Sequence, residues 1–182
     1  MDYLKELQVV LQSISEKDIV KLADIINNTL KNNRAVYIFG NGDSATNAFH
    51  FAADLSKTAV MYKKRLKIIC LNENMPLITA WANDENYESI YSRQLENFLE
   101  KDDLVIGIST SGNSPNVVRA LEFSNKNGAT TVALTAFEGG KVKNIVKHCF
   151  ITRTNNVEIA EDIHFIIGHM LKYQLIEKWT EE

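Results

Sequence analysis

The sequence predicts an α/β protein with a five-stranded, parallel, doubly wound sheet. Five short apolar runs are nearly continuous rather than alternating: AVYIF, LKIICL, LVIGIS, TTVALT and HCFIT. Runs of this kind are typical of strands that are buried on both faces. Segments with helical spacing separate the five runs, and such an alternation favours a parallel sheet covered by helices on both sides.

Two helices are expected before the first strand. The segment 3–14 has apolar residues at helical spacing. Ser13 and Glu16 have the spacing of a capping box, so a second helix is expected to begin there and to continue through IVKLADIINNTLKN. Between the strands, helices are expected to begin at Ser44, Asn86, Ser114 and about Glu138.

A final helix is expected over residues 157–179. It is apolar on most of its sides between Ile163 and Leu171. A helix that is apolar nearly all round is usually buried, so this one is expected to pack against the core or against another subunit.

Composition and charge narrow the class of protein. A chain of 182 residues suits one domain over 1–182, with the extra helices in 1–33 and the α/β core and last helix in 34–182. The net charge of −3, without a long basic run, disfavours nucleic acid binding. No apolar run approaches the ~20 residues of a membrane span. The N-terminus does not resemble a signal peptide. Cys70 and Cys149 lie in apolar runs, which is typical of reduced thiols in a cytoplasmic protein.

Two loops at the expected carboxyl edge of the sheet are suited to an anion, and ligands of doubly wound sheets bind beyond this edge. In the first loop, Gly40 and Gly42 allow tight turning, and Ser44 can cap the helix that follows. In the second, STSGNSP over 109–115, several hydroxyls meet the free N–H groups of a helix that begins near Ser114. Helix N-termini attract phosphate, so this loop predicts a phosphate site, although Ser and Gly also occur in ordinary turns.

The ligand is expected to be small. The chain has no G-x-x-x-x-G-K-[ST] sequence, which disfavours a P-loop nucleotidase. Gly40 to Ala45 match the relaxed G-x-G-x-x-A dinucleotide fingerprint, but no acidic residue ends the second strand at the required distance of about 20 residues. A small phosphorylated ligand therefore fits this edge better than a dinucleotide.

Three segments resemble sugar isomerase (SIS) domains: GNGDSATNAFHFAADLS, NDENYESIYSRQLE and DDLVIGISTSGNSPNVVRAL. Together with EDIHFIIGH, they are most similar to the phosphoheptose isomerase branch, and the resemblance covers nearly the whole chain. It implies a five-stranded parallel sheet in flavodoxin-like order and a homotetramer with active sites shared between subunits. The implied reaction is an aldose–ketose isomerisation of sedoheptulose 7-phosphate to D-glycero-D-manno-heptose 7-phosphate, for nucleotide-heptose and surface glycan biosynthesis.

The resemblance also implies roles for single residues. The phosphosugar would be bound by Asn41, Gly42, Ser44, Asn83, Asp84, Ser109, Thr110, Ser111 and Ser114. A divalent metal, expected to be zinc at one ion per subunit, would be held by His50, Asp54, Glu161 and His169. Asp54 and His169 would also be the catalytic acid and base.

Three positions depart from the family pattern. Asp54 replaces a longer glutamate, Thr58 replaces an arginine near the sugar, and Glu161 replaces a common glutamine, which should strengthen binding of a divalent cation. His50 and Asp54 are four residues apart on a predicted helix and share one face. Glu161 and His169 are eight residues apart, or roughly 12 Å along a helix axis, so joint ligation would be easier from different subunits.

Several alternatives stay open. The four polar residues could form a shell for zinc or another transition metal, or Asp54 and His169 could act as a metal-free acid–base pair. The chain could instead be a non-enzymatic SIS protein that binds a bacterial replication initiator, a regulatory phosphosugar sensor, or an isomerase of another sugar phosphate. The presence of all four polar candidates favours an enzyme.

Overall fold

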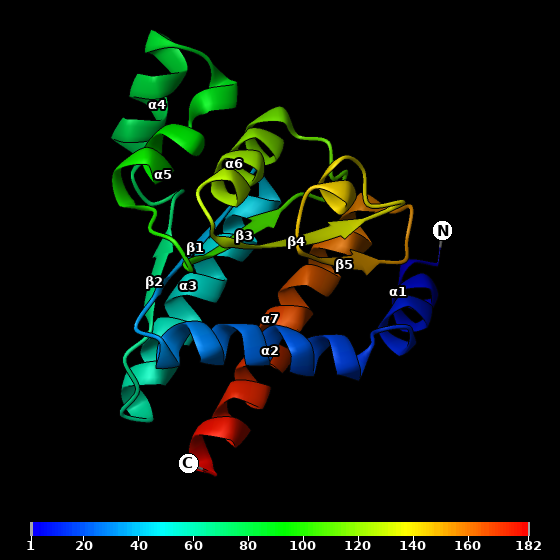
Figure 1. The fold of residues 1–182 in the computed structure, drawn as a ribbon. Coiled ribbons are helices and arrows are strands. Elements are labelled where there is room, and N and C mark those ends of the chain that lie inside the picture. Colours follow the sequence, from blue (N-terminus) through cyan, green and yellow to red (C-terminus); the bar gives the residue numbers. More distant parts are fainter. Residues whose placement is uncertain (1, 182) are drawn as a thin grey trace.

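The computed structural model describes residues 2–181, which form a sheet of five parallel strands flanked by helices (Figure 1). The strands are β1 (Ala35–Gly40), β2 (Lys67–Cys70), β3 (Leu104–Ile108), β4 (Thr130–Ala136) and β5 (His148–Thr152). Their order is β2-β1-β3-β4-β5, and every neighbouring pair is parallel. The predicted fold class and its flavodoxin-like order are therefore confirmed.

The sheet has a topological switch point between β1 and β3. The chain leaves β1 for β2 on one side and then crosses to β3 on the other side. Gly40 at the end of β1 is in register with Ile108 at the end of β3, so the loops that follow these two strands emerge side by side. Ligands of doubly wound sheets bind at this point, which agrees with the edge chosen from the sequence.

Helices cover both faces of the sheet (Figure 1). One face carries α1 (Tyr3–Gln12), α2 (Glu16–Lys31), α3 (Asp43–Met61) and α7 (Val157–Thr180). The other face carries α4 (Met75–Asp84), α5 (Ser92–Phe98), α6 (Pro115–Lys126) and the short 3-10 helices η1 (Tyr87–Ser89) and η2 (Val142–Asn144). Each face has its own apolar cluster, and both pack against the central strands.

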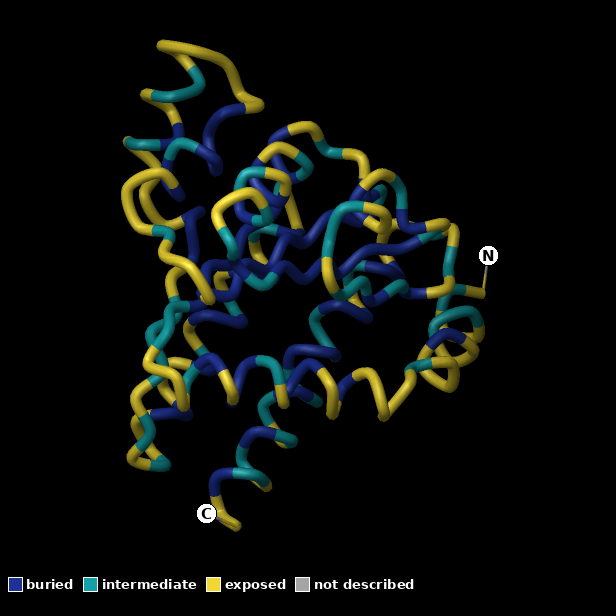
Figure 2. The backbone as a smooth tube through the Cα atoms, viewed as in Figure 1, coloured by how far each residue is buried: buried dark blue, intermediate teal, exposed yellow. Residues whose placement is uncertain are grey.

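Burial is concentrated in the middle of the sheet (Figure 2). Strands β1, β3 and β4 are buried almost throughout, as their continuous apolar runs predict, whereas the edge strands β2 and β5 are partly exposed. The last helix, α7, is confirmed as a buried helix, with Ile163, Ile167 and Leu171 in the core. Within residues 2–181, no helix combines the length and the apolar character needed to cross a membrane.

The connection between β2 and β3 differs from the prediction. The helix that begins directly after Asn86 is only the 3-10 helix η1, and the α-helix α5 begins at Ser92. The unpredicted helix α4 comes earlier in the same connection. Asn74 caps it by accepting a hydrogen bond from the Leu77 N–H at 3.2 Å, and Pro76 lies in its first turn. Both are start signals of a helix.

The prediction of a helix from about Glu138 is also wrong. This connection contains only η2, because the chain first turns through Gly139 and Gly140, whose φ angles are 87° and 53°. A right-handed helix cannot include residues with such angles. The resulting turn lies against the loop that follows β3, as described below.

Two capping predictions are wrong as well. Ser15 rather than Ser13 caps α2 by accepting from the Asp18 N–H, and the Ser13 hydroxyl instead donates to the Val10 carbonyl at the end of α1. Gly42 holds the N-cap position of α3, and Ser44 is buried in the first turn of that helix. Gly42 and Ser44 nevertheless both follow β1 at the switch point of the sheet.

Candidate active site

Helices α3 and α7 lie side by side on one face of the sheet (Figure 1). They are in tight contact at Gly168, where a Cβ atom would lie 2.5 Å from the buried ring of Phe51. A larger residue would push the helices apart, so glycine sets their separation. His50 precedes Phe51 in the sequence, and His169 follows Gly168. The same contact therefore brings these two histidines to face each other.

His50, Asp54 and His169 form a compact cluster between these helices. The Nε2 atoms of the two histidines are 2.9 Å apart, and His50 Nε2 lies 3.9 Å from Asp54 Oδ2. One donor atom from each residue lies within 4.8 Å of the other two. Two facing imidazole nitrogens and a carboxylate oxygen are a donor set that suits zinc and related divalent metals. The cluster is thus a possible metal-binding arrangement.

Phe165 orients both imidazoles of the cluster. Its ring stacks on His50 with centroids 4.2 Å apart and meets His169 edge-on at 5.1 Å. Burial lowers the pKa of His50, Asp54 opposes this shift, and the charges of His169 and Lys172 add to it. The neutral imidazole, which is the form that ligates a metal, is therefore favoured.

Asp54 is also bound by Lys172 of α7. The lysine Nζ donates to Asp54 Oδ1 at 3.0 Å and to Oδ2 at 3.1 Å. The exposed fractions of the two side chains are only 30% and 21%. Lys172 follows His169 by three residues, so its ammonium group lies on the same face of α7 as the imidazole.

Glu161, the fourth predicted metal ligand, lies apart from the cluster of its own chain. It lies beside the N-terminal part of α3, where the Asn47 side-chain amide donates to the main-chain carbonyl of Glu161 at 3.0 Å. Burial raises the pKa of the Glu161 carboxyl, and the adjacent carboxyl of Asp43 raises it further. The separation from His169 agrees with the two helical turns between them, and the three-residue cluster does not include Glu161.

The loop after β3 presents hydroxyl groups at the start of α6. Ser114 is the N-cap, and Ser109 Oγ donates to Ser114 Oγ at 3.1 Å. The Asn113 N–H donates to Ser111 Oγ at 3.2 Å. Thr110 Oγ1 is buried without a hydrogen-bond partner among residues 2–181. A buried hydroxyl without a partner is unusual, and in this loop, which leads into α6, it is a group that a ligand could satisfy.

Main-chain contacts from a neighbouring turn hold the loop after β3 in place. Gly112 has a φ angle of 63°, and a Cβ atom there would lie 2.2 Å from the carbonyl oxygen of Gly139. The Val142 N–H donates to the Gly112 carbonyl at 3.0 Å. The turn at 139–142, which replaces the expected helix, therefore supports the loop that presents the hydroxyls.

Asn41, a predicted substrate contact, links the two loops of the switch point. Its amide donates to Asn116 Oδ1 at 2.9 Å, and the Asn116 amide donates back to Asn41 Oδ1 at 2.8 Å. The hydroxyls of Tyr87 and Tyr91 lie 3.2 Å and 3.1 Å from the same Asn41 oxygen. In this structure the Asn41 side chain is engaged within the protein and fixes the loop after β1 against the start of α6.

Asn83 and Asp84 lie exposed at the C-terminal end of α4. The Asn83 amide donates to Asp84 Oδ1 at 3.0 Å. Tyr87, which follows closely, reaches Asn41, so this segment borders the first loop. Among residues 2–181, neither Asn83 nor Asp84 forms a direct hydrogen bond with the loop after β3.

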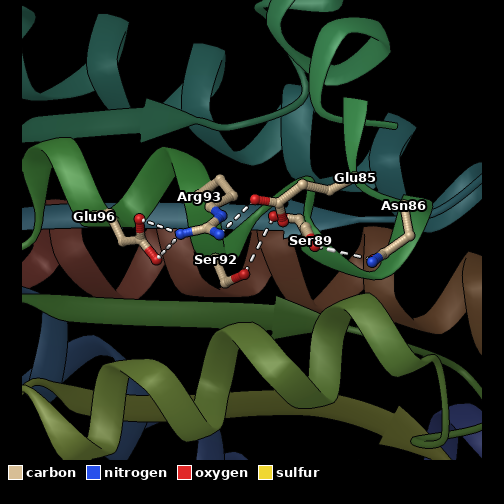
Figure 3. Close-up of polar contacts among 6 residues, drawn as sticks. All are labelled: Glu85, Asn86, Ser89, Ser92, Arg93 and Glu96. Atoms are coloured by element: carbon tan, nitrogen blue, oxygen red, sulfur yellow. Dashed lines mark hydrogen bonds and ion pairs between the residues drawn. The ribbon is translucent and has the colours of Figure 1, made fainter. Parts of the chain in front are cut away.

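Arg93 braces the segment that follows Asp84 (Figure 3). Its guanidinium group donates to the Glu85 carboxylate and, at 2.9 Å and 2.8 Å, to both oxygens of Glu96. The guanidinium carbon also lies 5.5 Å from the ring centroid of Trp81. Arg93 on α5 therefore ties the end of α4 in place through charge and through cation–π contact.

A buried histidine connects α7 to the loop after β3. His164 is fully buried, and its Nε2 lies 3.2 Å from the Thr135 carbonyl oxygen. The Thr135 hydroxyl donates in turn to the Thr110 carbonyl at 3.2 Å. Burial lowers the pKa of His164 to about 4, so this histidine is neutral at pH 7 and donates through Nε2.

Reasoning from the sequence missed four residues that complete the site: Phe165, Gly168, Lys172 and Asn116. The spacing of Lys172 from His169 is a signal that could have found it. The other three act through contacts between distant segments, for which the sequence pattern carries no signal.

Known proteins share this fold and these segments. The SIS domain family matches residues 2–136. A phosphoheptose isomerase from Aquifex aeolicus is 37% identical over 177 residues, which cover 97% of this chain and 92% of the relative. The chain belongs to the phosphoheptose isomerase branch of the SIS domain family.

Other members of the family agree over nearly the same length. A probable phosphoheptose isomerase from Thermoplasma acidophilum is 33% identical over 177 residues, covering 97% of each chain. The solved structure of phosphoheptose isomerase from Neisseria gonorrhoeae has a TM-score of 0.89 at 25% identity, covering 96% of this chain and 95% of its own. The resemblance and the enzyme class predicted from the sequence, a phosphosugar isomerase, are confirmed.

Proposed function

We propose that this protein isomerises sedoheptulose 7-phosphate to D-glycero-D-manno-heptose 7-phosphate, in the cytoplasm, for nucleotide-heptose and surface glycan biosynthesis. The observation that carries the proposal is the His50–His169 pair with Asp54 beside it, in the same fold as a hydroxyl-lined helix N-terminus. The relatives named phosphoheptose isomerase support the choice of a seven-carbon sugar phosphate.

The loop after β3 is proposed to bind the phosphate group. Its hydroxyls add hydrogen bonds without adding charge, and the N-terminus of α6 favours a negative charge. The unpartnered hydroxyl of Thr110 supports this assignment. The full set proposed to contact the sugar phosphate is Asn41, Gly42, Ser44, Asn83, Asp84, Ser109, Thr110, Ser111 and Ser114.

Asp54 and His169 are proposed to move the protons. Converting the ketose to the aldose takes one proton from C1 and adds one to C2, while another passes from O1 to O2. A carboxylate and an imidazole are suited to both kinds of transfer. His50 would keep the His169 ring in place through the contact between their Nε2 atoms.

Zinc is the proposed metal, at one ion per subunit. His50, Asp54 and His169 would hold it, and Glu161 could join only from another copy of the chain. The nitrogen and oxygen donors within 4.8 Å of one another support this assignment. A bound divalent ion would polarise the sugar carbonyl as a Lewis acid.

A homotetramer is the proposed assembly. Large apolar side chains are exposed on the helices that carry the cluster, including Phe49 at 43%, Val60 at 74% and Tyr173 at 67%, and on α1, including Leu4 at 75%. Apolar surface of this kind is typical of a face covered by another subunit. Light scattering at micromolar concentration should give four chains per particle, and a stable monomer would contradict a shared site.

The function is tested by incubating the purified protein with sedoheptulose 7-phosphate and following aldose formation by NMR, with and without a chelator. We expect the aldose signal to appear and to depend on residual metal. Fructose 6-phosphate and ribulose 5-phosphate serve as comparison substrates. Conversion of either one at a higher rate than the heptulose would assign a different sugar, and no conversion of any ketose phosphate would contradict an isomerase.

A further inference from the structure

The ion pair between Lys172 and Asp54 lies inside the candidate metal site. Both oxygens of Asp54 accept hydrogen bonds from the lysine Nζ, at 3.0 Å and 3.1 Å. One of these oxygens is also the atom that lies 3.9 Å from His50 Nε2. The carboxylate that completes the His–Asp–His donor set is therefore already bound by a cation of the chain itself.

The position of this lysine distinguishes it from an ordinary surface charge. It lies one helical turn beyond His169 on α7, and its partner lies one turn beyond His50 on α3. The two side chains are 30% and 21% exposed, so water screens their attraction only in part. The ion pair thus lies directly beside the two histidines of the cluster.

An ammonium group and a divalent cation compete for a carboxylate. A carboxylate has two oxygens and about four acceptor directions, but a cation held at one oxygen repels a second cation nearby. With Lys172 spanning both oxygens, a metal must displace at least one of its hydrogen bonds and overcome the repulsion of its charge.

We propose that Lys172 is an internal competitor for the metal and that it sets the metal affinity of the His50–Asp54–His169 cluster. The inference rests on the proposed function for the presence of a metal, but not for the identity of the sugar. In the metal-free protein, Lys172 neutralises Asp54 and keeps the carboxylate facing the histidines. In the loaded protein, the ammonium would give up at least one of its hydrogen bonds to Asp54. The metal is therefore exchangeable rather than permanently held.

The test measures zinc affinity of the full-length protein after chelator treatment, by competition with a chromophoric chelator. Wild type is compared with Lys172→Met, which keeps the aliphatic stem and removes the charge. The matched control is Lys178→Met, because Lys178 lies on the same helix and pairs with Asp24 at 2.7 Å, away from the cluster. A hydrogen bond between charged groups corresponds to about tenfold to a hundredfold in affinity. We expect Lys172→Met to bind zinc more tightly by this factor and Lys178→Met to match wild type.

Several results would overturn the inference. An unchanged affinity would mean that the lysine does not compete, and a weaker affinity would mean that it supports the metal-bound geometry instead. Absence of zinc binding in both wild type and Lys172→Met would overturn it as well. If Lys172→Met does not fold, Lys172→Gln is measured in its place, with the same expected tightening. If Lys172→Met tightens zinc binding as expected but the wild-type protein does not convert sedoheptulose 7-phosphate, only the proposed substrate is rejected.

Discussion

The loop after β3 and the cluster between α3 and α7 are built in opposite ways. The loop takes its hydroxyls from one continuous stretch, 109–114, and main-chain contacts from β4 and from the turn at 139–142 hold it. The cluster takes its groups from two helices, and His50 and His169 are 119 positions apart in the chain. These two meet because α3 packs against α7, closely so where Phe51 lies against Gly168.

This difference decides how each region should respond to mutation. Main-chain contacts survive the truncation of a side chain, so a loop variant should keep its shape and lose only the hydrogen bonds of the hydroxyl that is removed. The groups of the cluster are the donors and proton carriers themselves, so removing one should remove chemistry. Variants that remove one group from each region can therefore separate binding from chemistry.

The largest effect is expected from His169→Ala. The variant loses one of the two facing imidazoles, and hence both a proposed metal ligand and a proposed proton carrier. Loss of a general acid or base lowers a rate by about 100-fold to 10,000-fold, and we expect a fall in this range. Initial rates with sedoheptulose 7-phosphate, followed by NMR, measure it.

The control for this variant is His148→Ala, which removes a histidine of β5 that takes no part in the cluster. It should retain the wild-type rate. Near-normal activity of His169→Ala would reject both the metal-dependent and the metal-free mechanism, since each needs this imidazole.

The next effect concerns His164, which joins the two regions through Thr135. Its pKa is lowered from 6.5 to about 4 in the folded protein, because burial disfavours the charged ring. The unfolded chain therefore binds a proton more readily than the folded one. The stabilisation is complete above pH 6.5 and is lost as the pH falls toward 4, where the loss reaches about 3 kcal/mol.

Urea unfolding at several pH values tests this dependence. His164→Gln keeps an amide donor for the Thr135 carbonyl but cannot take up a proton in this range. We expect its free energy of unfolding to fall less than that of wild type between pH 6.5 and pH 4. The less buried His148, changed to Gln, should alter the slope less. Parallel curves for wild type and His164→Gln would show that the folded protein accommodates the proton.

A smaller effect is expected from Ser111→Ala in the loop. Losing one hydrogen bond to a charged group should weaken sugar phosphate binding by roughly 1.5–3 kcal/mol, or about tenfold to a hundredfold in affinity. Calorimetric titration measures the affinity, and thermal unfolding should be unchanged because main-chain contacts hold the loop. Ser13→Ala, which removes another turn hydroxyl far from the site, is the control. Equal affinities for all three proteins would mean that the loop serves only as a turn.

The contrast between the regions also explains what the sequence could predict. The loop was found because its hydroxyls, Gly112 and Ser114 are contiguous and follow an apolar run. The same is true of the strands, whose continuous runs predict burial. Errors arose where a local signal had a competitor: Ser15 lies two residues after Ser13 and caps α2 instead, and Gly139 with Gly140 stops a helix that the flanking residues favour.

The cluster could be predicted only in part. His50 and Asp54 share a helical face, and this spacing is visible in the sequence. Their pairing with His169 came from the family resemblance, since periodicity does not say which helices touch. Lys172 and Phe165 were missed because their importance depends on that contact. Glu161 is the opposite case, a residue that was predicted to join the cluster but lies outside it. It is two helical turns from His169 on its own chain.

The smallest effect is expected from Arg93→Gln, which tests whether the segment near the first loop depends on side chains. Arg93 donates hydrogen bonds to the carboxylates of Glu85 and Glu96 (Figure 3). It also lies over Trp81, so it fixes the end of α4 that carries Asn83 and Asp84. Arg93 acts on the site only through the end of α4, so we expect KM for the sugar phosphate to rise only about two- to fivefold. Because Arg93 does not reach the cluster, kcat should stay at the wild-type value.

Arg34→Gln, which breaks the exposed pair with Glu100 at 2.7 Å, is the matched control and should change neither constant. Arg93→Lys separates charge from geometry: lysine keeps the charge but not the fork that binds two carboxylates, so it should behave like Arg93→Gln. A fall in kcat with unchanged KM would instead connect this segment to the chemistry of the cluster.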